Sequence, residues 1–432
     1  MDKVINTLQH IWSVKTLRDK IIFTLFILVI FRILAHVTIP GADVAQIKTA
    51  LNPEDGSNGA LGVLSLLTGG AMQNFSIVLM GLTPYINASI IMQLLGVIVP
   101  SIENLKKEGE QGQMKINQYT RALTIPLAFL QSYGMMALIN RFSTSGNIIN
   151  LQDWPTTLMM MSVITAGTIF LMWLGELVSE KGIGNGISLI IFAGIVSHVP
   201  VSLYQSFNFS LPVALAALVA TVLLTVAVVY VAEGDRRVPV VYASKKSNMG
   251  QRSFLPLKIM QAGMIPIIFA VSLISFPSIA AQIFRDTSSE AGQVVIDFIL
   301  THLNPGSASF WYNIFYALLI VGFTYFYVSI VFDPKKIAEN IQKRSGYIPG
   351  YRPGTETENY LSDIMSRLNF WGGSFLAFVA ISPLFFSRWI SGGTNSVELF
   401  ISGAGIIIVV SVVLDIIRRI NAHLVTHDYS KL

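Results

Sequence analysis

Residues that could carry out chemistry are few in this chain, and they do not form a known catalytic motif. Its 432 residues include no cysteine, which excludes disulfides, thiolate nucleophiles and cysteine-ligated metals. The sequence has no G-x-x-x-x-G-K-[ST] phosphate loop, no H-E-x-x-H zinc motif and no G-x-S-x-G nucleophile motif. The run GIGNG at Gly182–Gly186 lacks the spacing of a dinucleotide-binding loop, and it opens an apolar helix rather than following a strand. We therefore expect no enzymatic activity, no cofactor and no metal.

Ionisable residues inside the apolar segments are also sparse. Arg32 and His36 lie in the first apolar segment, whereas Glu176 and Asp415 lie near the ends of later ones. An ionisable residue within a membrane is a functional candidate by default, although residues near segment ends more often extend to the interface. Ion- and proton-coupled transporters usually need such groups near mid-membrane, so their scarcity argues against that class.

Long apolar segments dominate the chain and must position everything else. Only 12% of the residues are charged and 53% are hydrophobic, whereas a soluble domain has about 25% charged residues. A membrane-spanning helix needs about 20 mainly apolar residues, because hydrocarbon cannot satisfy backbone polar groups. Ten segments meet this requirement: Lys20–Ile39, Phe75–Pro100, Arg121–Asn140, Pro155–Val178, Ile183–Leu203, Leu211–Ala232, Leu255–Ala281, Trp311–Phe332, Asn369–Ile390 and Ser396–Ile417.

The basic residues predict the orientation of these spans. With the N-terminus in the cytoplasm, the cytoplasmic segments hold 24 of the 29 lysines and arginines, and the reverse orientation inverts this ratio. Both termini are therefore expected in the cytoplasm. The first span is not followed by a small-residue cleavage site, so we expect it to be retained. The second five spans start on the opposite side from the first five, which suggests an inverted repeat with a pathway between its halves.

Three segments do not fit a plain helical bundle. Leu61–Ala71 (LGVLSLLTGGA) is too short to span a membrane, and its composition fits either a helix lying on the surface or a helix folded back into a protein-lined cavity. The cytoplasmic loops 233–254 and 333–368 are longer than two connected helices require. In the first loop, two extended stretches around Ser247-Asn248 predict a hairpin, and in the second the prolines and glycines favour an extended tip. Both loops are basic, which fits contact with lipid headgroups or, as their length favours, docking of a large cytoplasmic partner.

Branched aliphatic residues stand at mid-depth in several spans. Leu82 and Ile86 are four residues apart and share a helix face, as do Ile187 and Ile191. Ile268 and Ile408 lie near the middle of the seventh and tenth spans. Ordinary packed or lipid-facing aliphatics fit the same positions, and depth alone does not separate these residues from their neighbours.

Longer strings of this sequence resemble the SecY family of bacterial protein translocase subunits. They are LKKEGEQGQMKINQYTR at Leu105–Arg121, FLMWLGELVSEKGIGNGISLIIFAGIV at Phe170–Val196, LPLKIMQAGMIPIIFA at Leu255–Ala270 and IPGYRPG at Ile348–Gly354. The match extends from about residue 15 to residue 420, in order and with the loop lengths of the family.

This resemblance implies an all-α polytopic membrane protein whose ten transmembrane helices form two inverted five-helix halves around a central hourglass pore. It divides the chain into a cytoplasmic segment 1–19, a first half 20–203, a hinge loop 204–210, a second half 211–417 and a cytoplasmic tail 418–432. The implied function is a channel in the bacterial inner membrane. It passes unfolded secretory polypeptides across that membrane and releases membrane helices sideways into it.

The resemblance also implies roles for particular residues. A constriction ring is implied at Leu82, Ile86, Ile187, Ile191, Ile268 and Ile408. A plug is implied at 61–71, with Leu61, Leu64, Leu67, Gly69 and Gly70. Positions near a lateral gate are implied at Asn87 and Gln93. Docking of a partner is expected at Arg121, Lys245, Lys246, Arg252 and Arg352.

A ring of branched aliphatics dewets when empty, and it yields around many side chains without binding any of them tightly. Because the chain has no nucleotide site, the driving force must come from elsewhere. The resemblance implies that a SecA motor or a translating ribosome supplies it. The family further implies SecE- and SecG-like small subunits, signal peptides and translocating chains as partners, with no direct nucleic-acid specificity. Two other classes stay open at this point: a solute transporter with an inverted repeat, and a scaffold or insertase without a pore.

Overall fold

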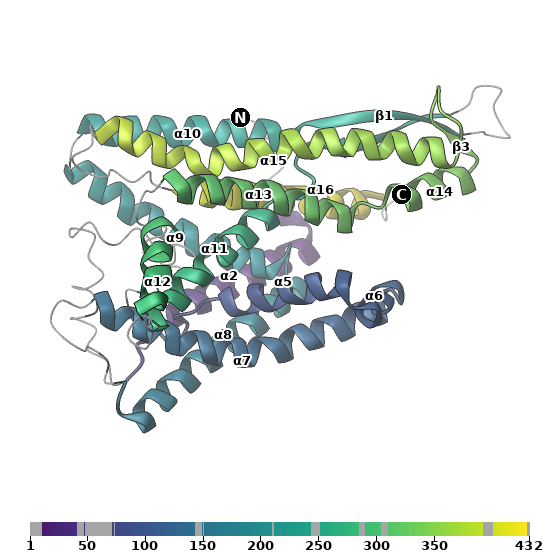
Figure 1. The fold of residues 1–432 in the computed structure, drawn as a ribbon. Helices are drawn as coiled ribbons and strands as arrows, with labels where there is room; N and C mark the ends of the chain where they lie inside the picture. The colour runs from purple at the N-terminus through teal and green to yellow at the C-terminus, as the bar shows by residue number, and fades with distance from the viewer. Residues whose placement is uncertain are drawn as a thin grey trace. The chain divides into compact units, whose positions relative to one another are not determined.

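The computed structural model describes residues 11–40, 47, 71–72, 74–142, 149, 151–209, 211–242, 251–284, 290–303, 310–391 and 401–429 (Figure 1). It confirms the predicted helical fold and adds one small sheet. The helices are α2 (Lys15–Leu34), α5 (Thr83–Ile98), α6 (Pro100–Lys107), α7 (Glu110–Phe142), α8 (Trp154–Lys181), α9 (Gly186–Phe209), α10 (Leu211–Glu233), α11 (Ile265–Phe284), α12 (Glu290–His302), α13 (Phe310–Val331), α14 (Pro334–Lys343), α15 (Thr355–Ser391) and α16 (Gly403–Tyr429).

Contacts along the chain divide it into two compact units. The first contains Met1–Ala214, Ser272–Tyr312 and Val412–Leu432, and the second contains Leu215–Val271 and Asn313–Ser411. Helices α10, α11, α13 and α16 each run from one unit into the other. The predicted halves 20–203 and 211–417 are defined by topology rather than by contacts, and they stay a prediction.

Each of the ten predicted spans contains a helix. In the described ranges, five helices are long and apolar enough to cross a membrane alone, and the bent pair α5–α6 makes a sixth candidate. The other predicted spans are occupied by α2, α7, α11 and α16. Three predicted starts are wrong. The helix of the second span begins at Thr83 rather than Phe75, and that of the seventh begins at Ile265, after a strand that includes Leu255. The helix of the tenth begins at Gly403 rather than Ser396.

Residues 74–82 form turns instead of helix, yet their backbone amides and carbonyls still form hydrogen bonds within the protein. Ile39 N–H donates to Phe75 O at 3.0 Å, and Ile77 N–H donates to Val37 O at 3.0 Å, which ties this segment to the residues directly after the end of α2. Phe75 and Leu79 are fully buried in an apolar cluster with α7 and α8. Non-helical backbone at membrane depth is tolerated where protein covers it, and this segment meets that condition.

The break between α5 and α6 has a local cause. Val99 is extended, with φ −101° and ψ 112°, and it precedes Pro100 at the start of α6. A residue before proline is disfavoured in the helical region, and proline is well accommodated in a first helical turn. The two helix axes meet at 98°, so α6 turns away from the direction of the second span.

The two long basic loops fold together within the second unit. Strands β1 (Asp235–Tyr242) and β2 (Gln251–Lys258) pair antiparallel, which confirms the predicted hairpin. Strand β3 (Gly346–Tyr347), from the other loop, pairs with the free edge of β1. Figure 1 shows β1, β3, α14 and the start of α15 gathered at one end of this unit. We call this assembly the docking module, after the role predicted for its two loops. Its buried residues include Val238, Val240, Leu257, Ile341, Ile348 and Leu361.

Helix α8 packs closely against the buried turn at residues 74–82 because Gly167 has no side chain. A Cβ added at Gly167 would lie 1.9 Å from Ile77 O, so Gly167→Ala must displace backbone. Overpacking of this kind costs about 1–3 kcal/mol. Gly322 on α13 is the matched control, since a Cβ there meets nothing within 4 Å, and Ala in place of Gly there is expected to be neutral or stabilising by up to ~1 kcal/mol. We expect the midpoint of thermal unfolding in detergent to fall for Gly167→Ala only; equal midpoints would contradict this packing.

Candidate functional site

The GIGNG run forms the turn between α8 and α9 and fixes where α9 begins. Asn185 Oδ1 accepts hydrogen bonds from Ile187 N–H at 3.1 Å and Ser188 N–H at 3.3 Å. Gly186 N–H donates to Ser179 Oγ at 2.9 Å. These bonds satisfy amides of the first helical turn that otherwise lack partners. The run therefore has a structural role, and it holds Ile187 in the first turn of α9.

Glycines let α2, α8 and α9 approach closely at this turn. A Cβ at Gly186 would lie 1.9 Å from Gly175 O, and a Cβ at Gly182 would lie 2.5 Å from Thr24 Oγ1. Thr24 Oγ1 also accepts a hydrogen bond from Ile183 N–H at 3.2 Å. The start of α9 is thus held by both neighbouring helices, and Ile187 is held with it.

Four of the predicted ring residues lie in the first unit. Leu82 is 3% exposed and directly precedes α5, and Ile86 N–H donates to Leu82 O at 3.0 Å, which places these two residues one turn apart. On α9, Ile191 is 5% exposed and Ile187 is half-buried. Helices α5 and α9 both pack against α8. The structure therefore supplies two aliphatic pairs on helices that share one neighbour.

The other two ring residues lie in the second unit. Ile268 is half-buried on α11, next to Phe269, whose ring meets Phe323 edge-on at 5.7 Å. Ile408 is 1% exposed on α16. The start of α16 lies close to α15, because a Cβ at Gly403 would lie 2.1 Å from the main chain of α15. Since the six residues are divided between the units, a ring that joins all of them stays a prediction.

The predicted plug and gate residues have different outcomes. Leu61, Leu64, Leu67, Gly69 and Gly70 lie outside the described residues, as do the docking residues Lys245 and Lys246. Ala71, the last residue of the plug segment, is fully buried, and its carbonyl accepts a hydrogen bond from Ser76 N–H at 3.0 Å. Asn87 is half-buried on α5, and Gln93 Nε2 donates to Ser89 Oγ at 3.4 Å on the same helix. The gate role of these two residues stays a prediction.

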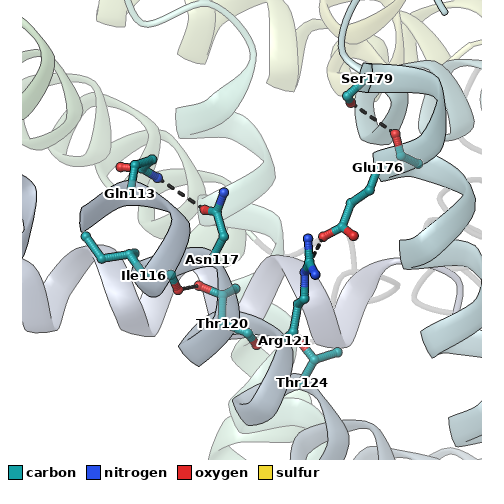
Figure 2. A network of polar contacts seen from close by, with 9 residues as sticks. Gln113, Ile116, Asn117, Thr120, Arg121, Thr124, Glu176 and Ser179 are labelled. Atoms are coloured by element: carbon teal, nitrogen blue, oxygen red, sulfur yellow. Dashed lines mark hydrogen bonds and ion pairs between the residues drawn. The ribbon is translucent and has the colours of Figure 1, made fainter. Parts of the chain in front are cut away.

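Arg121 forms an ion pair that the sequence did not reveal. Its Nε lies 2.7 Å from Glu176 Oε1, which joins α7 to α8. Figure 2 shows the two side chains extending toward each other from these helices. The side chains are 48% and 26% exposed, so the pair is only partly shielded from solvent. Glu176 is 55 positions from Arg121, and no local sequence pattern links residues this far apart.

Arg352 lies in a loop tip that hydrogen bonds and an aromatic contact hold in one conformation. Its N–H donates to Glu356 Oε2 at 3.0 Å, and its carbonyl accepts from Thr357 Oγ1 at 2.9 Å, which anchors the tip to the start of α15. Tyr351 stacks on Tyr360 with ring centroids 4.0 Å apart. Among the residues that the structure describes, none forms a hydrogen bond or an ion pair with the guanidinium of Arg352, which is exposed to solvent. Arg252 lies on β2, opposite Val241 of β1.

A charge swap tests whether Arg121 acts through Glu176. We expect Arg121→Glu to lower the midpoint of thermal unfolding, because it replaces an ion pair with two carboxylates that repel each other. The double variant Arg121→Glu/Glu176→Arg should restore most of the loss, with a coupling free energy of about 0.2–1 kcal/mol, typical of a partly exposed pair. Lys107→Glu, in the exposed pair with Glu103 on α6, is the matched control and should change the midpoint little. Failure of the double variant to recover would show that Arg121 does not act through this ion pair.

Comparisons of sequence and of structure with known proteins point to the same family. The SecY family profile matches residues 76–417. The chain is 41% identical to the protein translocase subunit SecY of Halalkalibacterium halodurans over 98% of both chains, and 41% identical to that of Corynebacterium glutamicum over 96% of this chain and 97% of the relative. Among solved structures, a protein-conducting channel superposes with a TM-score of 0.67 at 20% identity, covering 96% of this chain and 93% of that chain. Sec61 in a canine ribosome–channel complex superposes with a TM-score of 0.63 at 19% identity over the same shares. By its sequence and its fold, this multi-pass membrane protein belongs to the SecY family.

Proposed function

We propose that this chain is the channel-forming subunit of a bacterial protein translocase in the inner membrane, with both termini in the cytoplasm. The observation that carries the proposal is the similarity to SecY translocase subunits, which extends over nearly the whole chain. The helical fold and its likeness to solved protein-conducting channels support it. Unfolded secretory chains pass through the centre, and membrane helices leave sideways near Asn87 and Gln93.

The gate consists of the aliphatic ring and the plug. The local geometry suits a seal, because the turns that precede Leu82 are bonded to the residues directly after α2 and the cap at Asn185 fixes the start of α9. Branched side chains on these fixed backbones can yield to a passing chain and still exclude water when the channel is empty. The burial of Ala71 provides a fixed point at one end of the plug segment.

The docking module receives the partner that supplies the driving force, a SecA motor or a ribosome. The module has its own apolar core, so it offers a folded surface rather than two separate loops. Arg352 is exposed at its tip, and within the described part of the chain its guanidinium has no bonding partner. It can form paired hydrogen bonds with a carboxylate or a phosphate. Solved structures of this fold include channels bound to ribosomes, which gives a precedent for a partner of this kind. SecE- and SecG-like subunits complete the proposed complex.

Crosslinking of a stalled secretory chain tests the channel directly. Because the chain has no cysteine, a single cysteine at Ile86, Ile191 or Ile408 gives a unique thiol. We expect a stalled precursor with one cysteine at mid-membrane to form disulfides at all three positions. Val222→Cys on α10, a 52% exposed aliphatic in an apolar helix, is the control and should not react. Reaction only at Val222, or at none of the ring positions, would contradict a central polypeptide path.

Reversal of the tip charge tests the docking role. We expect Arg352→Glu to impair motor-driven secretion more than ribosome-coupled helix insertion, since loss of an interface arginine weakens binding by roughly tenfold. Lys343→Glu is the matched control, because Lys343 lies in the same module and is exposed, and it already faces Glu339 at 3.9 Å. Secretion and insertion are measured in vesicles that contain the full complex. An equal loss of both activities in Arg352→Glu would count against a selective contact with the motor.

A further inference from the structure

Helix α12 has an apolar face that the protein leaves uncovered. Val294 is 71% exposed, Val295 is 58% exposed and Phe298 is 59% exposed, and the three lie on adjoining positions one turn apart or less. On the same helix, Ile296 is 7% exposed and fixes which side faces the protein. The exposed polar residues Gln293, Asp297 and Thr301 repeat every four positions and form a separate stripe. The helix therefore has a buried side, a polar side and an exposed apolar side.

The connections of α12 place it beside the ends of two apolar helices. Only residues 285–289 separate it from α11, and residues 303–309 lead to α13. At about 3.5 Å per residue, these connections extend at most roughly 20–30 Å. The end of α11, all of α12 and the start of α13 belong to one compact unit. The apolar face of α12 is therefore within reach of the ends of α11 and α13, where these helices leave the membrane.

The start of α13 carries features of a membrane interface. Phe310 is 71% exposed and Trp311 is 62% exposed, and exposed aromatic residues at the end of an apolar helix mark the level of the lipid headgroups. Beside this level, the ring of His302 stacks on Phe298 with centroids 4.5 Å apart, which adds a polar flank to the apolar face. An amphipathic helix with an aromatic and aliphatic face next to a membrane lies in the interface plane, with that face among the upper acyl chains.

We infer that α12 is an interfacial anchor, whose Val294, Val295 and Phe298 insert into the lipid bilayer at the boundary between headgroups and acyl chains. The anchor holds the ends of α11 and α13 at a fixed depth. Membrane contact itself does not depend on the channel activity. Its assignment to the outer leaflet does rest on the proposed function, through the proposed orientation of the chain.

Site-specific quenching by lipid tests this anchor. The complete chain, assembled with its small subunits, is reconstituted into vesicles of phosphatidylethanolamine and phosphatidylglycerol with brominated phosphatidylcholine. A bimane label is attached to the single thiol of Phe298→Cys, of Val294→Cys or, as a matched control on the polar stripe of the same helix, of Gln293→Cys. We expect bromine near the carbonyl end of the acyl chain to quench the two apolar positions at least about twofold more than Gln293, and more than bromine near the terminal methyl does.

Equal quenching at Phe298 and Gln293, or none at either apolar position, would overturn the anchor and indicate a protein partner over this face. If Phe298→Cys does not assemble, Val294→Cys carries the same test. A membrane-impermeant thiol reagent added from outside to Gln293→Cys reports the leaflet. Strong lipid quenching without labelling from outside would support the anchor and contradict the proposed orientation, so the two failures are distinguishable.

Discussion

The structure depends on one constraint: inside hydrocarbon, every backbone amide and carbonyl must find its partner within the protein. Helices meet this constraint by themselves, and apolar helices occupy all ten predicted spans. The informative region is residues 74–82, where the second predicted span is not helical. There the backbone bonds to the residues directly after α2, and buried side chains such as Phe75 keep water and lipid away. The chain could depart from helix directly before Leu82 only because α7 and α8 cover that departure.

The same constraint explains why glycine is concentrated at contacts rather than at reactive sites. Where α8 approaches the turn at Ile77 or the start of α9, carbonyl oxygens occupy the space that a Cβ at Gly167 or Gly186 would need. The run at Gly182–Gly186 is rich in glycine, as phosphate-binding turns are, but it lacks the spacing of a dinucleotide-binding loop. In this chain the backbone amides of the turn bond within the protein. Gly186 N–H donates to Ser179 Oγ, and the amides of Ile187 and Ser188 donate to Asn185 Oδ1. A helix start that is capped and held in this way gives Ile187 and Ile191 a fixed backbone, as the proposed seal requires.

Sequence reasoning succeeded where a pattern is local. The existence of each span follows from about 20 apolar residues, and the β1–β2 hairpin follows from two extended stretches beside a polar turn. The bend at Val99 had a signal in Pro100, the residue at which the predicted second span ends. Pairings between distant residues had no such signal. Val241 meets Tyr347 across the small sheet, and Arg121 meets Glu176 between two helices, because tertiary packing rather than any sequence period decides these contacts. The predicted aliphatic ring rests on the family resemblance. Spacing shows that Leu82 and Ile86 share a helix face, as do Ile187 and Ile191, but it does not separate them from neighbouring aliphatics.

The docking module is joined to the proposed gate by short and stiff connections within the second unit. Strand β2 ends at Lys258 and α11 begins at Ile265, so Ile268 lies in the first turn of the helix that follows the module. Ile259 N–H donates to Gly234 O at 3.1 Å, and a Cβ at Gly372 of α15 would lie 2.5 Å from Ile259 O. From the tip, α15 continues as one helix to Ser391, about 55 Å at 1.5 Å per residue. In the proposed function, a partner that displaces the tip therefore acts directly on α15, whereas its path to Ile268 includes the turns at residues 259–264.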